Sequence, residues 1–252
     1  MVEKISSIKK RYNQIWGLIK KNIELYFKKG PVIIFGILFP FFLALSWVLG
    51  RPIDNIQLFS GFLGMSVFFL GTAISPVIFP WETREKSLER IISAPVSILD
   101  LIFSIISSST LFSIIISTVV CIILIPIFSI PILVFGWFLL GSFLLSWISS
   151  SLGLLISAFP SDTVSDIMLI TTLVKFPLLF ISGIFIPLSL MPQPLFILSL
   201  ISPITYFVDL LKSLCSLGTI GIGIDLLMLT IFFCMFFILA YLFHKRTILK
   251  RI

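Results

Sequence analysis

Charged residues are scarce in this sequence: they make up 12% of its 252 residues, whereas an ordinary soluble domain has about 25%. Hydrophobic residues make up 58%, and the mean hydropathy is +1.20. This composition excludes both a solvated globular enzyme and a disordered chain. It predicts an all-α integral membrane protein that has the lipid bilayer as its solvent.

The usual sequence signs of a catalyst are also missing. The chain has no Gly-Lys dipeptide, which a phosphate-binding loop requires, and it has a single histidine. Its cysteines, Cys121, Cys215 and Cys234, are odd in number and widely separated, so they predict neither a disulfide framework nor a metal site. Outside residues 81–97 the carboxylates are scattered singly. We therefore expect no catalytic site and no bound cofactor or metal in the chain itself.

Long apolar runs predict six membrane-spanning helices within a single domain, residues 1–252, because each span needs about 20 apolar residues. The expected spans cover residues 31–50, 58–79, 98–125, 132–159, 164–186 and 222–243. Serines recur every three to four residues in the third and fourth spans, which predicts close packing between these helices. A polar pathway for a solute is the alternative interpretation of the same stripes.

Basic residues gather at the two ends of the chain: eight of the eighteen Lys and Arg precede residue 30, and four follow residue 244. The positive-inside rule then predicts that both termini lie in the cytoplasm. We expect the protein in the cell membrane. Attraction to anionic lipid explains this charge without nucleic acid.

Residues 194–217 are apolar enough for a further span but contain Pro203, Asp209 and Lys212. A seventh crossing would move the basic carboxyl end outside, against the positive-inside rule. We therefore expect a re-entrant or outer-surface helical pair here.

The first residues, 4–28, predict a basic amphipathic helix in the membrane interface. Apolar side chains such as Tyr12, Trp16, Ile19 and Tyr26 recur at steps of three and four, and lysines occupy the other side. A helix packed on a soluble core is the alternative, but the chain offers no soluble core.

The one dense charge cluster between spans is WETREKSLERIISAPVS, residues 81–97. Its charged first half predicts a short cytoplasmic helix with an apolar edge, and Pro95 is expected to stop this helix. A helix that carries both signs of charge is typical of a docking surface for a soluble partner. A solvated connection is the alternative.

This string resembles the cytoplasmic loop of type-2 ATP-binding-cassette (ABC) exporter permeases, in which Leu-Glu-Arg, two apolar residues and a small residue precede Pro-Val-Ser. A second string, LLFISGIFIPLSLMPQPLFILSLISPITYFVDLLKSL, is similar to the region that follows the fifth span in that family. With the six-span layout, the resemblance covers nearly the whole chain. One departure is Ser87, where the family often has glycine.

The resemblance implies an ATP-driven exporter that works as a dimer of permeases, identical or not, with separate ATPase subunits that bind ATP and Mg²⁺. The cargo would be a drug, lipid, glycan or similar molecule. The resemblance assigns coupling to the ATPase to Trp81, Glu82, Arg84, Glu85, Leu88, Glu89, Arg90, Ile91 and Pro95. It assigns the outer gate to Ser182, Gly183, Pro187, Pro203 and Tyr206.

Lys175 is not part of the resemblance. It lies eleven residues after Val164, which places it roughly 16 Å deep in an apolar core about 30 Å thick. A lysine there costs roughly 2.5 to 3.5 kcal/mol on insertion scales. Either it lines the translocation path and attracts an anionic group, or its role is structural. In the structural case it hydrogen-bonds a broken backbone near Pro177, or the span is shifted and the lysine lies nearer a surface.

Two other classes of membrane protein remain open at this point. A secondary transporter or channel would show paired half-repeats or several ionisable residues within the membrane. An integral-membrane enzyme would need converging catalytic side chains. Of such residues, only Lys175 stands clearly inside a span.

Overall fold

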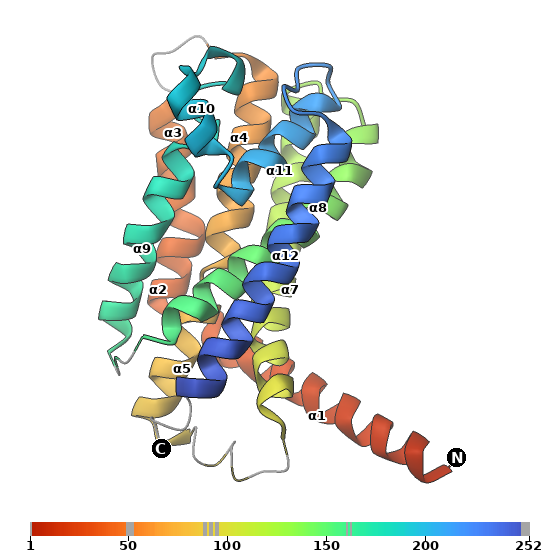
Figure 1. Ribbon diagram of the computed structural model, residues 1–252, viewed down its shortest axis with the longest axis vertical. Coiled ribbons are helices and arrows are strands. Elements are labelled where there is room, and N and C mark those ends of the chain that lie inside the picture. Colours follow the sequence, from red (N-terminus) through yellow and green to blue (C-terminus); the bar gives the residue numbers. More distant parts are fainter. Residues whose placement is uncertain are drawn as a thin grey trace.

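The computed structural model describes residues 2–48, 53–87, 90, 93, 96–159, 161 and 163–247. These residues form helices and contain no strand. The long helices form one bundle, and α1 (Val2–Tyr26) projects from one end of it (Figure 1). We call this end the α1 end, and the opposite end, which carries α10 (Gln193–Ser199), the α10 end.

Three helices confirm the third, fourth and sixth apolar runs. They are α7 (Ile98–Ile127), α8 (Leu133–Ser157) and α12 (Ile222–Thr247), and each is long and apolar enough to cross a membrane. The second run also qualifies, but it extends over Asn55–Arg84 and is divided into α4 (Asn55–Gly71) and α5 (Ser75–Arg84). Among the described residues, four segments therefore meet the length and hydropathy of a span.

The first apolar run forms three short pieces: α2 (Gly30–Ile33), the π-helical η1 (Ile34–Leu38) and α3 (Phe39–Val48). Pro40 explains the π-helical turn, because it has no N–H to donate to the Gly36 carbonyl four residues earlier. The fifth run forms α9 (Val164–Phe180), which ends before the expected residue 186. Neither of these two runs is among the four segments that meet the length and hydropathy of a span, so the count of six remains a prediction.

Residues 194–217 form a helical pair, as expected. α10 and α11 (Pro203–Ser213) are bent by 101° relative to each other, and the short η2 (Leu188–Leu190) precedes them. Pro203 occupies the first turn of α11, where its missing N–H has no intrahelical partner to lose. Such a bend fits either a broken span or a re-entrant segment, so the expected re-entrant or outer-surface placement remains a prediction.

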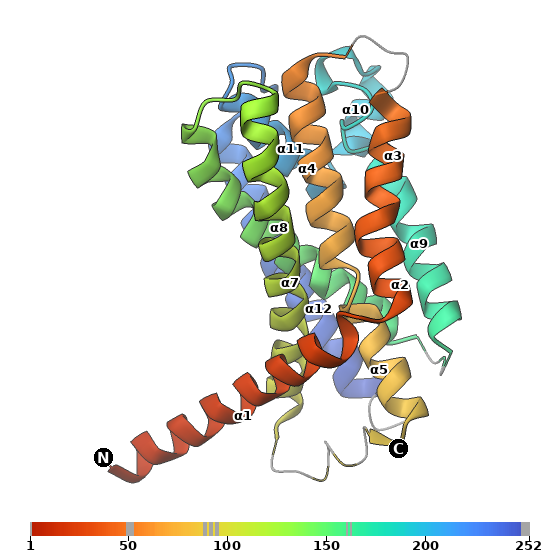
Figure 2. The ribbon, with the colours of Figure 1, turned by 180° about the vertical axis from the view of Figure 1, so that it is seen from behind.

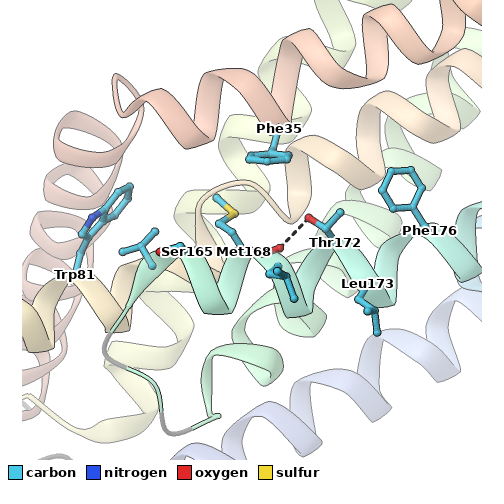
Figure 3. A pocket seen from close by; sticks show the side chains of 9 residues that line it. Phe35, Trp81, Ser165, Met168, Thr172, Leu173 and Phe176 are labelled. Carbon is cyan, nitrogen blue, oxygen red and sulfur yellow. Dashed lines mark hydrogen bonds between the residues drawn. The ribbon is translucent and has the colours of Figure 1, made fainter.

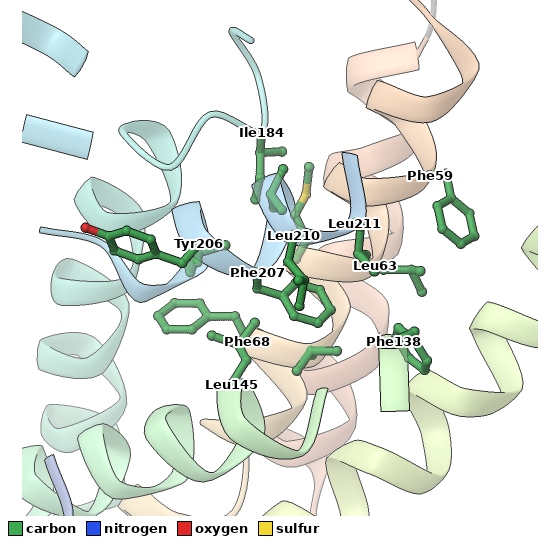
Figure 4. Packing of buried hydrophobic residues seen from close by; sticks show 14 of the residues in the cluster. Phe59, Leu63, Phe68, Phe138, Leu145, Ile184, Tyr206, Phe207, Leu210 and Leu211 are labelled. Atoms are coloured by element: carbon green, nitrogen blue, oxygen red, sulfur yellow. The ribbon is translucent and has the colours of Figure 1, made fainter. Parts of the chain in front are cut away.

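The main core lies where α4, α8 and α11 meet (Figure 4). Phe68, Phe138 and Phe207 are fully buried there, and the Phe138 and Phe207 rings contact edge to face with centroids 6.3 Å apart. Serines of the two stripes connect α7 to α4 and to α8, since Ser113 donates to the Val67 carbonyl at 3.0 Å and Ser146 donates to Ser113 at 2.9 Å. These two bonds agree with the packing interpretation of the stripes.

Candidate functional site

At the α1 end, α1 is attached to the first turn of α7, which it crosses (Figure 2). The Arg11 guanidinium donates to Asp100 Oδ1 from Nη2 at 2.6 Å and from Nε at 2.9 Å. Asp100 itself is held by Ser97, which caps α7: the Ser97 hydroxyl donates to Asp100 Oδ2 at 2.6 Å and accepts from the Asp100 N–H. This two-bond ion pair fixes where α7 begins relative to α1.

A second attachment joins α1 to α5. Lys21 forms an ion pair with Glu82, which is 1% exposed, and the Tyr26 ring stacks on Trp81 at 5.3 Å between centroids. Burial, with the nearby Glu82 carboxylate, raises the pKa of the Tyr26 hydroxyl. Lys29 Nζ lies 5.3 Å from the Trp81 ring centroid. Together, the two attachments tie α1 to both ends of the connection that joins α5 to α7.

The expected helix over Trp81–Arg90 is interrupted. α5 ends at Arg84, Glu85 caps it, and Lys86 has a φ of +53° that a helix cannot continue through. Glu82 faces α1 from inside, whereas an outward position was expected.

The remaining predicted coupling residues divide into two groups. Arg84, Glu85 and Arg90 are exposed at the α1 end, as a docking surface requires. Leu88, Glu89, Ile91 and Pro95 lie outside the described residues. The coupling role of both groups remains a prediction.

In the middle of the bundle, the side chain of Lys175 of α9 reaches the break between α4 and α5. Residue 76 is a proline, so it cannot supply the N–H that would bond the Thr72 carbonyl in a continuous helix. Lys175, which is 1% exposed, donates to this carbonyl at 3.3 Å, and its Nζ lies 5.2 Å from the Phe69 ring centroid. A cation thus replaces the donor that Pro76 removes.

The carbonyl one residue before Thr72 is satisfied by hydroxyl groups. The Gly71 carbonyl accepts from Ser109 Oγ at 2.7 Å and from Ser150 Oγ at 3.0 Å. Gly71 also permits this approach, because a Cβ on it would lie 2.7 Å from Ser149 Cβ. We call Gly71, Thr72, Ser109, Ser150 and Lys175 the broken-helix centre.

The structure thus agrees with the structural hypothesis for Lys175, with one correction: the broken backbone that it bonds is at Thr72, and not near Pro177. Among the described residues, no carboxylate lies within ion-pair distance of Lys175. Whether Lys175 also acts in transport remains a prediction.

An apolar groove of about 770 Å³ runs along α9 beside this centre (Figure 3). Phe35 of η1, Trp81 of α5 and Phe176 of α9 lie along it, and the Thr172 hydroxyl within it donates to its own helix at the Met168 carbonyl, 2.8 Å away. Trp81 therefore belongs both to this groove and to the contact with α1. Any movement of α1 that displaces Trp81 also changes the groove.

The predicted outer-gate residues lie at the α10 end. Gly183 has a φ of +79°, and a Cβ on it would lie 2.9 Å from Leu188 Cδ2, so this turn requires glycine. The Tyr206 hydroxyl donates to the Leu200 carbonyl at 2.9 Å, and the Ser182 hydroxyl donates to Leu179 at 2.6 Å. Pro187 lines a small cavity nearby, and Pro203 begins α11. Ser182, Gly183 and Tyr206 therefore hold the turns of this segment. The gating role of all five residues remains a prediction.

Several polar residues that the structure connects were missed from the sequence. Asp100 pairs with Arg11, and Gln57 donates to the Gly183 carbonyl at 3.0 Å and to that of Ile184. Asp209 accepts from the backbone N–H groups of Thr219 and Ile220. The sequence offered no signal for these pairs. For the broken-helix centre it offered one: Pro76 follows Thr72 by four residues, which marks a carbonyl without a helical donor.

Comparison with known families gives a match over most of the chain. The family model described as ABC-2 type transporter matches residues 13–216, which is more than half of the sequence. No curated protein matches the chain. The matched region contains the Lys21–Glu82 attachment of α1, the broken-helix centre and the α10 end. The chain is a multi-pass membrane protein with helices apolar enough to span a bilayer, and it belongs to the ABC-2 type transporter family, as the membrane-spanning permease component.

Proposed function

We propose that the chain is the permease of an ATP-driven exporter and works as a dimer with separate ATP-hydrolysing subunits. ATP and Mg²⁺ would bind in those subunits, since the chain has no Gly-Lys dipeptide for a phosphate-binding loop. The α1 end would face the cytoplasm in the cell membrane, with six spans and both chain ends on that side.

The observation that carries this proposal is the double attachment of α1. Arg11 with Asp100 and Lys21 with Glu82 tie α1 to both sides of the connection between α5 and α7. Arg84 and Glu85 are exposed on that connection and are free to meet the charges of a partner. A partner that moves this surface would therefore move α1, α5 and α7 together.

The route from this surface to the transport path runs through α5. Its Trp81 lines the groove along α9, and α4 meets it at the broken-helix centre. A hinge at the break, residues 72–74, would let α5 change direction while α4 stays packed against α8 and α11. The groove would form one half of a path completed by the second permease, and the segment at the α10 end would shape the exit.

A charge-reversal experiment tests this proposal. The double variant Arg84→Glu with Glu85→Lys keeps the net charge but inverts the exposed pattern. It should abolish ATPase docking and transport while the chain still folds and inserts. Asp166→Lys is the control for reversal of an exposed charge on another helix, because Asp166 is also exposed but lies on α9. Normal transport by the double variant would contradict the assignment of the docking surface.

A further inference from the structure

A small polar cavity at the α10 end is lined by the side chain of a buried lysine, Lys212. It measures about 260 Å³, far more than the roughly 10–15 Å³ that holds one water molecule. Asp54, Gln57, Ser189, Lys212 and Thr219 are its polar lining residues. The cavity joins the start of α4, the turn before η2 and the end of α11.

Lys212 is only 5% exposed, although it carries an ammonium group with three donors. One of these reaches the Gly183 carbonyl at 3.4 Å, a long bond to an acceptor that Gln57 already satisfies at 3.0 Å. No carboxylate of the described residues lies within ion-pair distance of Lys212. Asp209, one turn earlier, is occupied by the Thr219 and Ile220 amides.

A buried ammonium without an anion in contact is unfavourable, so the cavity beside it fits an anionic group. Asp54 lines the same cavity and uses Oδ2 to cap α4, through the N–H groups of Ile56 and Gln57. The cavity therefore presents a cation and an anion that do not touch each other. A dianion would be repelled by Asp54, whereas a ligand with one negative and one positive group fits both.

We propose that this cavity binds the head group of a zwitterionic phospholipid such as phosphatidylethanolamine, with its phosphodiester on Lys212 and its ammonium toward Asp54. Lysine is a common phosphate ligand in proteins. Leu217, which also lines the cavity and is half exposed, offers an apolar surface for the start of an acyl chain. The site is separate from the ATPase docking surface and does not depend on it.

Native mass spectrometry of the full-length protein in detergent tests the proposal, with phosphatidylethanolamine, phosphatidylglycerol and inorganic phosphate as probes. Phosphatidylethanolamine should bind the wild type at least about tenfold more tightly than Lys212→Met, and Lys212→Arg should retain binding. Lys20→Met removes an exposed lysine on α1 and should leave the affinity for phosphatidylethanolamine unchanged.

Asp54→Asn tests the second half of the site with Lys212 intact. Asparagine caps helices about as well as aspartate, so α4 keeps its start. This variant should lose the preference for phosphatidylethanolamine over phosphatidylglycerol. Equal binding of phosphatidylethanolamine by the wild type and Lys212→Met would overturn the proposal. Displacement of the lipid by millimolar inorganic phosphate would also overturn it, because the site would then hold a soluble anion.

Discussion

Replacing Lys175 with methionine should destabilise the protein because Pro76 is present. Lys175→Met removes the ammonium that donates to the Thr72 carbonyl at 3.3 Å and keeps most of the side-chain volume. A hydrogen bond to a charged group contributes about 1.5–3 kcal/mol, and an orphaned buried carbonyl costs about 1–3 kcal/mol. Removal of the buried charge offsets part of this loss, so the single variant gives an incomplete answer.

A double-mutant cycle with Pro76→Ala isolates the carbonyl. Alanine at position 76 restores a backbone N–H for Thr72, so Lys175→Met should cost at least about 1 kcal/mol less in that background than in the wild type. The desolvation of the ammonium is common to both arms and cancels. Pro80→Ala is the matched control, because the N–H that it restores faces the carbonyl of Pro76, four residues earlier, and not that of Thr72.

The assay is the free energy of unfolding in mixed micelles, followed by circular dichroism as SDS is added. Distant, independent sites add within about 0.3–0.5 kcal/mol. A coupling between Lys175 and Pro76 inside that range would refute the conclusion that the lysine replaces the missing helical donor. A coupling of equal size with Pro80 would refute it as well.

Three further predictions follow from other contacts. Gly71→Ala should destabilise the chain by about 1–3 kcal/mol in the same assay, since its Cβ would lie 2.7 Å from Ser149 Cβ. Gly136→Ala is the control: its Cβ would have nothing within 4 Å, so it should be neutral or stabilising by up to about 1 kcal/mol. Equal effects of the two substitutions would contradict the close packing at Gly71. Arg11→Gln should free α1 from α7, so spin labels on the two helices should show a broader distance distribution, and an unchanged distribution would show that the Asp100 ion pair does not hold α1. The purified chain, freed of any other ATPase, should show no ATP hydrolysis above background in a coupled phosphate-release assay, and hydrolysis by the chain itself would contradict its role as a permease.

The long helices were predictable because a bilayer imposes a simple requirement on them. Each span needs about 20 apolar residues, so α7, α8 and α12 follow from hydropathy within a few residues. The break in the second span was missed because residues 71–76 remain apolar or small, and hydropathy does not register a lost N–H. Reading Pro76 against the carbonyl four residues earlier would have located it.

The site was predictable in part, for a different reason. The charge density of residues 81–97 marks a surface, but it does not show which charges face inward. Glu82 faces α1 because Lys21 and Tyr26 both donate to its carboxylate. These two partners precede Glu82 by 61 and 56 positions in the sequence. The Arg11–Asp100 pair, 89 positions apart, depends on the fold in the same way. A periodicity argument sees one helix at a time, so it cannot find such pairs.

We propose that this permease is driven by a separate ATPase that docks at the α1 end. The most direct test measures the ATPase activity of the assembly extracted from its own membrane with a tagged chain. We expect ATP hydrolysis to co-purify with the wild-type chain and with Asp166→Lys, and to be lost with the Arg84→Glu, Glu85→Lys variant. Co-purification of the activity with all three, or with none, would contradict the claim.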